Sequence, residues 1–362
     1  MTEPDEFLRD RLRSAQPGNP AARPTYPQGP TRGARHRTSA PPPAGAAPYP
    51  DFQHTPSTPV RRPRPSRGWR RAVQVATLGL VNLGPSPKER QEAEFAAQVQ
   101  LVLNGQYKVG VLGKGGVGKT TVAACVGSVF AELRHNDRVV AVDADTAFGR
   151  LGSRIDPQAD GSYWDVASDK NLQSFADLRG RVGNNSAGLF VLAGGPGATG
   201  KRHVLDPAIY REAALRLDRH FTISIVDCGS TLDAPVTKEA LRDLDALIVV
   251  SSPWADGASA AAQTMEWLGA RGLTDLLQRT VVVLNDSDGH ADKHTRAVLA
   301  QQFVNRGQAV VEVPFDPHLR PGGVIDATSE ISLATRRRFL QIAAAVVWFF
   351  ASKPANPGTH HR

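Results

Sequence analysis

The chain has 362 residues, of which 41% are hydrophobic, and its formal charge is +8 at neutral pH. Its two cysteines, Cys125 and Cys228, are too few for a disulfide scaffold or a four-cysteine zinc site. It has no apolar run long enough for a transmembrane helix and no signal-peptide core near its start. These features argue against disulfide-rich secreted and membrane-spanning proteins, and they predict a reduced, cytoplasmic protein.

The first 67 residues differ from the rest in both proline content and charge. Of the 27 prolines, 15 lie within the first 65 residues. Residues 1–71 contain thirteen arginines, no lysine and five acidic residues, whereas the other 291 residues carry equal numbers of basic and acidic side chains. Such a segment buries too little apolar surface to offset the entropy cost of ordering, so we predict a disordered Pro/Arg-rich tail over 1–67. It is either a solvated linker or an arm that docks on a protein partner, an acidic surface or nucleic acid.

A separate segment at 68–105 follows the tail. It contains an apolar run that ends at Gly84, then Pro85-Ser86-Pro87, and then a stretch rich in glutamate. Acidic residues in the first turns favour a helix, because they interact with the positive end of its dipole. The composition assigns this segment no function.

From residue 106 to residue 352, apolar strand-like runs alternate with helical patterns. The predicted strands lie at 107–112, 139–142, 189–192, 223–226, 246–250, 281–284 and 309–313. The predicted helices lie near 119–133, 206–218, 237–243, 257–271, 292–304 and 335–352. Strands that are apolar on both faces are typical of a parallel sheet covered by helices. We therefore predict a doubly wound, mostly parallel α/β domain over 106–352, with ligands at the carboxyl ends of its strands, and a disordered tail at 353–362.

A phosphate-binding motif follows the first predicted strand. The run Gly113-Lys114-Gly115-Gly116-Val117-Gly118-Lys119-Thr120-Thr121 satisfies the pattern G-x-x-x-x-G-K-[ST]. Its glycines let backbone N–H groups turn toward phosphate oxygens, and the following helix directs its positive end at the same anion. Lys119 would reach the β- and γ-phosphates, and the Thr120 hydroxyl would hold Mg²⁺.

The second lysine of this loop, Lys114, is informative because only nine of the 43 basic residues are lysines. The run K-G-G-V-G-K-T-T is a deviant Walker A motif, and in it the chain resembles the MinD/ParA-type P-loop ATPases. The resemblance implies that ATP is the nucleotide and that Lys114 reaches the nucleotide of a partner subunit in a homodimer. The alternative is a solvated loop lysine.

Two acids, Asp143 and Asp145, follow the second predicted strand, and strand alternation points both toward the same face. Such a pair beside a phosphate site repels unless a cation or a proton lies between the carboxylates. The resemblance implies that Asp143 supports the Mg²⁺ shell and that Asp145 positions the attacking water, so that Lys114, Lys119 and Asp145 form the catalytic set. In MinD/ParA relatives a proline often follows the second aspartate, whereas this chain has Thr146 there. The alternative is an acid pair that caps a turn.

Asp227 ends the predicted strand at 223–226 and is followed by Cys228 and Gly229. A buried strand that ends in an acid, downstream of a phosphate loop, is the Walker B pattern, in which the carboxylate holds Mg²⁺ through water. The predicted metal-binding residues are therefore Thr120, Asp143 and Asp227.

The base-binding residues are implied by the resemblance alone. An asparagine after the strand at 281–284, here Asn285, binds the adenine edge in MinD/ParA relatives. The loop after the strand at 309–313, here beginning at Pro314, packs on the base. An asparagine in that position is also an ordinary turn residue.

The predicted helix at 335–352 begins with Arg336, Arg337 and Arg338 and continues with an almost wholly apolar run. MinD relatives end in a basic amphipathic helix that binds membrane. Here the apolar residues surround the helix, which favours burial in the core. The two interpretations are core packing, or peripheral contact with a partner or the inner face of the plasma membrane.

Further similarity, at residues 81–86, 227–230, 251–258 and 314–319, resembles the EspI-like MinD-type ATPases associated with type VII secretion. The resemblance implies a slowly hydrolysing switch in which ATP and Mg²⁺ close a homodimer, and a protein partner in a secretion apparatus reached through the tail. One alternative is a ParA-like partition ATPase that binds DNA, against which the neutral body counts. The other is an adaptor that binds nucleotide without turnover.

Overall fold

A computed structural model describes residues 71–72, 75–77, 82–145, 149–194 and 204–352. The predicted tails at 1–67 and 353–362 lie outside the described residues. Among the described residues, the boundary between two compact units falls between Arg90 and Gln91.

The described part of the smaller unit holds the start of helix α3 (Pro87–Val99). The Ser86 N–H donates to Glu89 Oε2 at 2.7 Å, and the Glu89 N–H donates to Ser86 Oγ at 3.2 Å. This reciprocal pair is a capping box, with Pro87 at the first helical position, where its missing N–H has no cost. The predicted helix start is confirmed.

The larger unit contains one eight-stranded sheet in the order β3-β4-β2-β5-β1-β6-β7-β8. Every neighbouring pair is parallel except β3 and β4. The strands are β1 (Tyr107–Gly113), β2 (Val139–Asp143), β3 (Gly183–Asn184), β4 (Phe190–Leu192), β5 (Ile223–Asp227), β6 (Ala246–Ser251), β7 (Thr280–Asn285) and β8 (Ala309–Val313). The predicted doubly wound, mostly parallel fold is confirmed.

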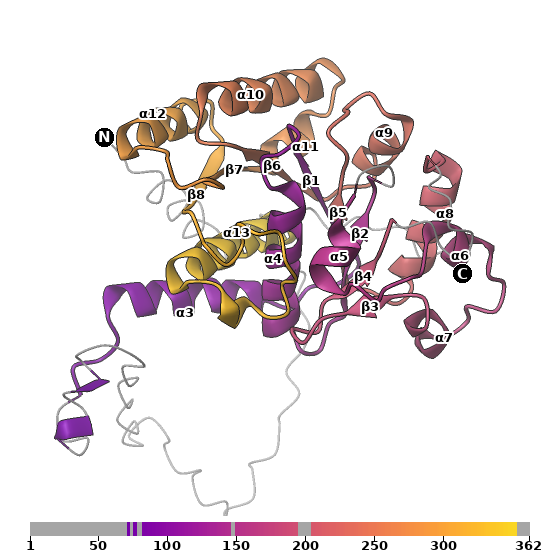
Figure 1. The fold of residues 1–362 in the computed structure, drawn as a ribbon, viewed down its shortest axis with the longest axis horizontal. Helices are drawn as coiled ribbons and strands as arrows, with labels where there is room; N and C mark the ends of the chain where they lie inside the picture. Colours follow the sequence, from indigo (N-terminus) through magenta and orange to yellow (C-terminus); the bar gives the residue numbers. More distant parts are fainter. Residues whose placement is uncertain (1–70, 73–74, 78–81, 146–148, 195–203, 353–362) are drawn as a thin grey trace, which may run out of the picture. The chain divides into compact units, whose positions relative to one another are not determined.

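The helices connect successive strands and cover both faces of the sheet (Figure 1). They are α4 (Lys119–Leu133), α5 (Leu151–Ile155), α6 (Tyr163–Ser168), α7 (Phe175–Arg179), α8 (Pro207–Asp218), α9 (Pro235–Leu241), α10 (Ala255–Ala270), α11 (Thr274–Gln278), α12 (Lys293–Val304), the 3₁₀ turn η3 (Thr328–Glu330) and α13 (Leu333–Ala351). All six predicted helices of this unit are present. The short helices α5, α6, α7 and α11 were not predicted, because five or six residues carry too little periodicity.

Alternating residues of each strand enter two separate cores. On β1, Val109 and Val111 belong to one apolar cluster, and Leu112 belongs to the other. The first cluster is closed by α3, α4, α5 and α13, and the second by the helices α6 to α12. This burial on both faces explains why the strands read as continuous apolar runs.

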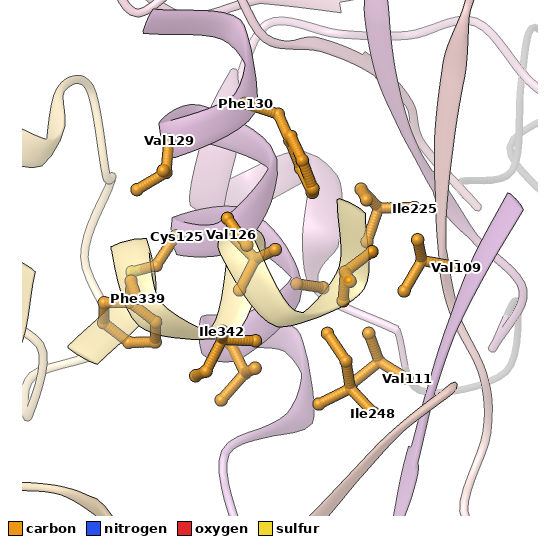
Figure 2. Packing of buried hydrophobic residues seen from close by; sticks show 14 of the residues in the cluster. Val109, Val111, Cys125, Val126, Val129, Phe130, Ile225, Ile248, Phe339 and Ile342 are labelled. Atoms are coloured by element: carbon orange, nitrogen blue, oxygen red, sulfur yellow. The ribbon is translucent and has the colours of Figure 1, made fainter. Parts of the chain in front are cut away.

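Helices α4 and α13 lie side by side on the first face (Figure 1). Figure 2 shows Val126 and Phe130 of α4 and Ile342 of α13 directed toward the strand residues Ile225 and Ile248. The helix that begins at the phosphate loop is therefore packed against the sheet, with the last helix beside it.

The apolar residues of α13 are buried, which supports core packing for the segment 335–352. Phe339 and Ile342 are fully buried. Arg336 forms an ion pair with Glu132 at 3.2 Å, and Arg337 forms one with Glu92 at 2.6 Å. Among the residues that the structure describes, no helix combines the length and apolar character needed to cross a bilayer.

The carboxyl ends of β1, β2, β5, β7 and β8 meet at one edge of the sheet. The connection from β1 leads toward β2 on one side, whereas the connection from its neighbour β6 leads to β7 on the other side, so the direction of the chain reverses between β1 and β6. Such a switch point is where ligands bind in open parallel sheets. The phosphate loop at the end of β1 is therefore at the position that the topology favours for a ligand.

Replacement of Phe339 by alanine should lower the free energy of unfolding by about 3–5 kcal/mol, because it opens a cavity under α4 and α13. The matched control is Leu333→Ala on the same helix, where the side chain is 52% exposed and a change within about 0.5 kcal/mol is expected. Urea unfolding of the full chain measures both. Equal effects of the two substitutions would contradict the buried placement of α13.

Candidate nucleotide-binding site

The phosphate loop depends on glycine at its two ends. Gly113 has a φ of 150°, and a Cβ atom there would lie 2.2 Å from the carbonyl oxygen of Val250. Gly118 has a φ of 94° and is the N-cap of α4, with no side chain capping the helix. The first N–H groups of a fifteen-residue helix are thus left for an external acceptor, which is the arrangement that binds phosphate.

A cavity of about 550 Å³ opens at this helix end. The predicted site residues that line it are Gly115, Gly116, Gly118, Lys119, Thr120, Thr121, Asp145, Asp227, Asn285 and Pro314. Four predicted residues do not line it, namely Gly113, Lys114, Val117 and Asp143. The structure therefore brings together the end of β1 and the loops that follow β2, β5, β7 and β8.

The two lysines of the loop point to different surroundings. Lys119 Nζ donates to the carbonyl oxygen of Lys114 at 3.4 Å, so it curls back over the loop. Lys114 Nζ lies 2.8 Å from Asp256 Oδ2 at the start of α10, and both side chains are more than half exposed. An ion pair this exposed adds little stability, so it leaves Lys114 available to other anions.

Thr120 and Asp227 form the polar centre of the site. The Thr120 hydroxyl donates to Asp227 Oδ2 at 2.6 Å. Asp227 is 2% exposed, and its other oxygen, Oδ1, is buried without a hydrogen-bond partner among the described residues. Burial raises the pKa of Asp227 to about 6, although the hydrogen bond from Thr120 and the charge of Lys119 oppose the shift. A buried acceptor without a donor is costly, and a hydrated cation would satisfy it.

The residues present fit Mg²⁺. Within the described ranges, no three histidine, cysteine or acidic side chains gather closely enough to hold a metal ion by themselves. Mg²⁺ does not need such a cluster, since it is commonly held by one or two protein oxygens together with substrate phosphates and water. The Thr120 hydroxyl and the Asp227 carboxylate are ligands of this kind.

Asp143 and Asp145 differ in burial, since Asp143 is fully buried and Asp145 is half-buried. Asp143 is 1% exposed and accepts the N–H groups of Asp145 at 3.1 Å and Leu151 at 3.0 Å. Strand β2 ends at Asp143, so strand alternation no longer applies to Asp145, which alone lines the cavity. Burial, and next the neighbouring charge of Asp227, raise the pKa of Asp143 to about 8. A direct role of Asp143 in holding the metal stays a prediction.

Asn285 is 7% exposed, and its Nδ2 donates to the carbonyl oxygen of Val117 at 2.8 Å. The side chain therefore holds the phosphate loop, in addition to lining the cavity where a base would lie. Pro314 lines the same end of the cavity, at the carboxyl end of β8.

Among the lining residues that were not predicted is Arg154 of α5, which also donates to Thr121 Oγ1 at 2.8 Å. Phe315, Asp316, Leu319 and Arg320 also line the cavity and belong to the loop after β8, which the resemblance places on the base. The helix α5 is too short to be read from periodicity. Motifs describe the contacts of the phosphate loop, but nothing in the sequence indicates that an arginine more than thirty positions away bonds to it.

The fold and this site define a P-loop nucleotide-binding protein. The family model described as "CobQ/CobB/MinD/ParA nucleotide binding domain" matches residues 110–321, and the chain belongs to this family. The cell division ATPase MinD of Pyrococcus furiosus is similar in structure, with a TM-score of 0.51 and 20% identity over 66% of this chain and 98% of that one. A ParA family ATPase from Chlorobium tepidum TLS has a TM-score of 0.49 and 20% identity over 67% of this chain and 96% of that one.

The chain is also similar in sequence to the ESX-1 secretion-associated protein EspI of Mycobacterium tuberculosis (strain H37Rv). The two are 34% identical over 289 residues, which cover 77% of this chain. The chain spans 42% of the length of that relative.

The raised pKa of Asp143 predicts a pH dependence of stability in the absence of metal and nucleotide. At pH values between the unfolded pKa of Asp143, near 3.8, and its folded pKa of about 8, the native state binds the proton of Asp143 more strongly than the unfolded state does. Stability should therefore fall as the pH rises from 5 to 8, because ionised Asp143 is buried beside Asp227. In Asp143→Asn this part of the pH dependence should disappear.

Urea unfolding in EDTA at several pH values measures this effect. The control is Asp233→Asn, since hydrogen bonds from Lys238 and Arg271 lower the pKa of Asp233 to about 2 and keep it ionised throughout this range. Parallel pH profiles for Asp143→Asn and the wild type would contradict the prediction that folding raises the pKa of Asp143.

Proposed function

We propose that this protein is a Mg²⁺-dependent, slowly hydrolysing ATPase that acts as a dimerisation switch of the MinD/ParA type, as an accessory component of a type VII secretion system. The observation that carries the proposal is the bond between Thr120 and the buried Asp227, whose second oxygen lacks a partner at the open end of α4. A cationic ligand at the helix end would offset the cost of burying this carboxylate, and it would also neutralise the negative charge of bound phosphates.

In this proposal Thr120 and Asp227 hold Mg²⁺, which neutralises charge on the β- and γ-phosphates when it is bound. Lys119 extends from the carbonyl oxygen of Lys114 to the phosphates. Asp145, beside Gly229 at the wall of the cavity, orients the water that attacks the γ-phosphorus. Asn285 holds the loop and the base, and Pro314 packs on the base.

The dimerisation step is assigned to Lys114. Its solvent-exposed ion pair with Asp256 holds it away from the cavity of its own subunit. The weak pair exchanges readily for the more concentrated charge of a triphosphate on a second copy. ATP binding thus selects a closed dimer, and hydrolysis releases it.

The secretion assignment is supported by the similarity to the ESX-1 secretion-associated protein EspI. The Pro/Arg-rich residues 1–67 are proposed as the tether to a protein partner at the cytoplasmic face of the secretion apparatus. The chain covers less than half of that relative, so its partners and its transport role belong to the proposal alone.

The alternatives are less well supported. The arginines at 336–338, which a DNA-binding surface would use, are engaged inside the domain: Arg336 with Glu132, Arg337 with Glu92 and Arg338 with Gln341. An adaptor that binds nucleotide without turnover needs no carboxylate to orient an attacking water, whereas Asp145 lies at the wall of the cavity.

Substitutions at the site test the ATPase. Lys119→Ala should weaken ATP binding about tenfold or more, because a charge-assisted contact to the phosphates is lost. Asp145→Asn should still bind ATP but release phosphate at least about a hundredfold more slowly, since only the water loses its acceptor. Calorimetry and a phosphate-release assay measure the two effects. The control is the exposed acid Asp160, whose replacement by asparagine should change neither. Turnover of Asp145→Asn equal to the wild type would favour the adaptor.

Light scattering of the full chain tests the switch. The mass should double with ATP–Mg²⁺ and stay monomeric with ADP, and Lys114→Ala should remain monomeric in both. The matched control is Lys238→Ala, which removes another exposed lysine in an ion pair, here with Asp233 at 3.0 Å, and should dimerise normally. ATP binding without any change of mass in the wild type would refute the dimerisation switch.

A further inference from the structure

The described part of the chain has three buried basic side chains, and they differ in how their charge is balanced. Lys108, Arg134 and Arg154 are each 5–6% exposed. Lys108 is paired with Asp218 at 2.7 Å and also with Asp243. Arg134 is paired with Asp137 at 2.6 Å. Both balanced cations lie outside the nucleotide cavity.

Arg154 has no such balance among the residues that the structure describes. Its guanidinium donates to Thr121 Oγ1 at 2.8 Å and to the carbonyl oxygen of Gly323, which are both neutral acceptors. Within the described ranges no carboxylate lies within 4 Å of it. The stretches between those ranges contain no aspartate or glutamate at all. The pKa of Arg154 is lowered by burial, and the only opposing influence comes from the thiol of Cys125.

The position of Arg154 indicates what balances the charge. It lines the nucleotide cavity, and it bonds to Thr121, the last residue of the phosphate loop. A buried guanidinium without a counter-ion is costly, and its planar donors match phosphate oxygens. Two of its five N–H donors are assigned to Thr121 and Gly323, which leaves others for a ligand.

We infer that Arg154 is a phosphate-binding residue outside the P-loop, and that the phosphates of the bound nucleotide supply the counter-charge it lacks. The inference rests on the proposed nucleotide binding and adds a second source of positive charge, from α5, to Lys119. Arg154 also holds the loop after β8, because its guanidinium donates to the carbonyl oxygen of Gly323 and its backbone carbonyl oxygen accepts the Ile325 N–H at 2.7 Å. Contact with the phosphates therefore also fixes the loop beside the base.

The test compares a neutral and a charged replacement in the full chain. Arg154→Gln keeps hydrogen-bond donors but removes the charge, so ADP and ATP should bind about tenfold to a hundredfold more weakly. Arg154→Lys keeps the charge but not the planar donors, so it should lose clearly less affinity than Arg154→Gln. Without nucleotide, the melting temperature of Arg154→Gln should equal or exceed that of the wild type, because an unbalanced buried charge is removed.

The matched control is Arg134→Gln, in which an equally buried arginine leaves its partner Asp137 behind. It should lower the melting temperature and leave nucleotide affinity unchanged. Calorimetry with ADP and ATP in Mg²⁺, and thermal melts without ligand, give the readouts. Unchanged affinity in Arg154→Gln would overturn the inference, and so would equal losses in Arg154→Gln and Arg154→Lys, which would mark a purely structural contact. Failure of the wild type to bind either nucleotide would instead overturn the proposed function.

Discussion

The site depends on the hydrogen bond between Thr120 and Asp227, which connects the start of helix α4 to the end of strand β5. Thr120 lies in the first turn of α4, directly after the loop that follows β1, and Asp227 is the last residue of β5, the parallel neighbour of β1. The bond fixes the start of α4 against the adjacent strand and sets one carboxylate at the helix end. Asn285 adds a second brace from β7, through the carbonyl oxygen of Val117. The phosphate loop is therefore held from both sides of β1 before any ligand binds, which limits the ordering cost of binding.

A second set of contacts connects the base end of the cavity with the far end of α4. The loop after β8 leaves the cavity near Arg320 and is bonded at Ile325 to both Arg154 and Asn185. At Thr328 it reaches Glu132, near the last turn of α4, with an N–H bond of 2.7 Å. One helix thus has the phosphate loop at its start and anchors the loop after β8 at its end. The burial of α4 against the sheet, beside α13, makes this helix a rigid spacer between the two loops (Figure 2).

The sequence predicts the regular part of this structure well, for a physical reason. Each parallel strand is buried on both faces, so runs such as 223–226 and 246–250 are uniformly apolar and easy to recognise. The phosphate loop is equally readable, because its glycines and Lys119 act within nine consecutive residues. The different burial of Asp143 and Asp145 was not predictable, since it depends on where β2 ends. The place of Arg154 in the cavity was not predictable either, because it depends on contacts with residues distant in the chain, Thr121 and Gly323.

Among the described residues, three buried charged side chains at or beside the site, Asp143, Asp227 and Arg154, form no ion pair. Burial raises the pKa of both aspartates, and the charge of Asp227 raises that of Asp143 further. Lys108 and Arg134, by contrast, each contact an acid. Unbalanced burial destabilises the free protein, so it persists only where a ligand relieves it. A magnesium nucleotide carries both kinds of charge that are missing, a cation for Asp227 and phosphates for Arg154. Binding of such a nucleotide should therefore raise the stability of the fold, which is the energetic requirement of the proposed switch.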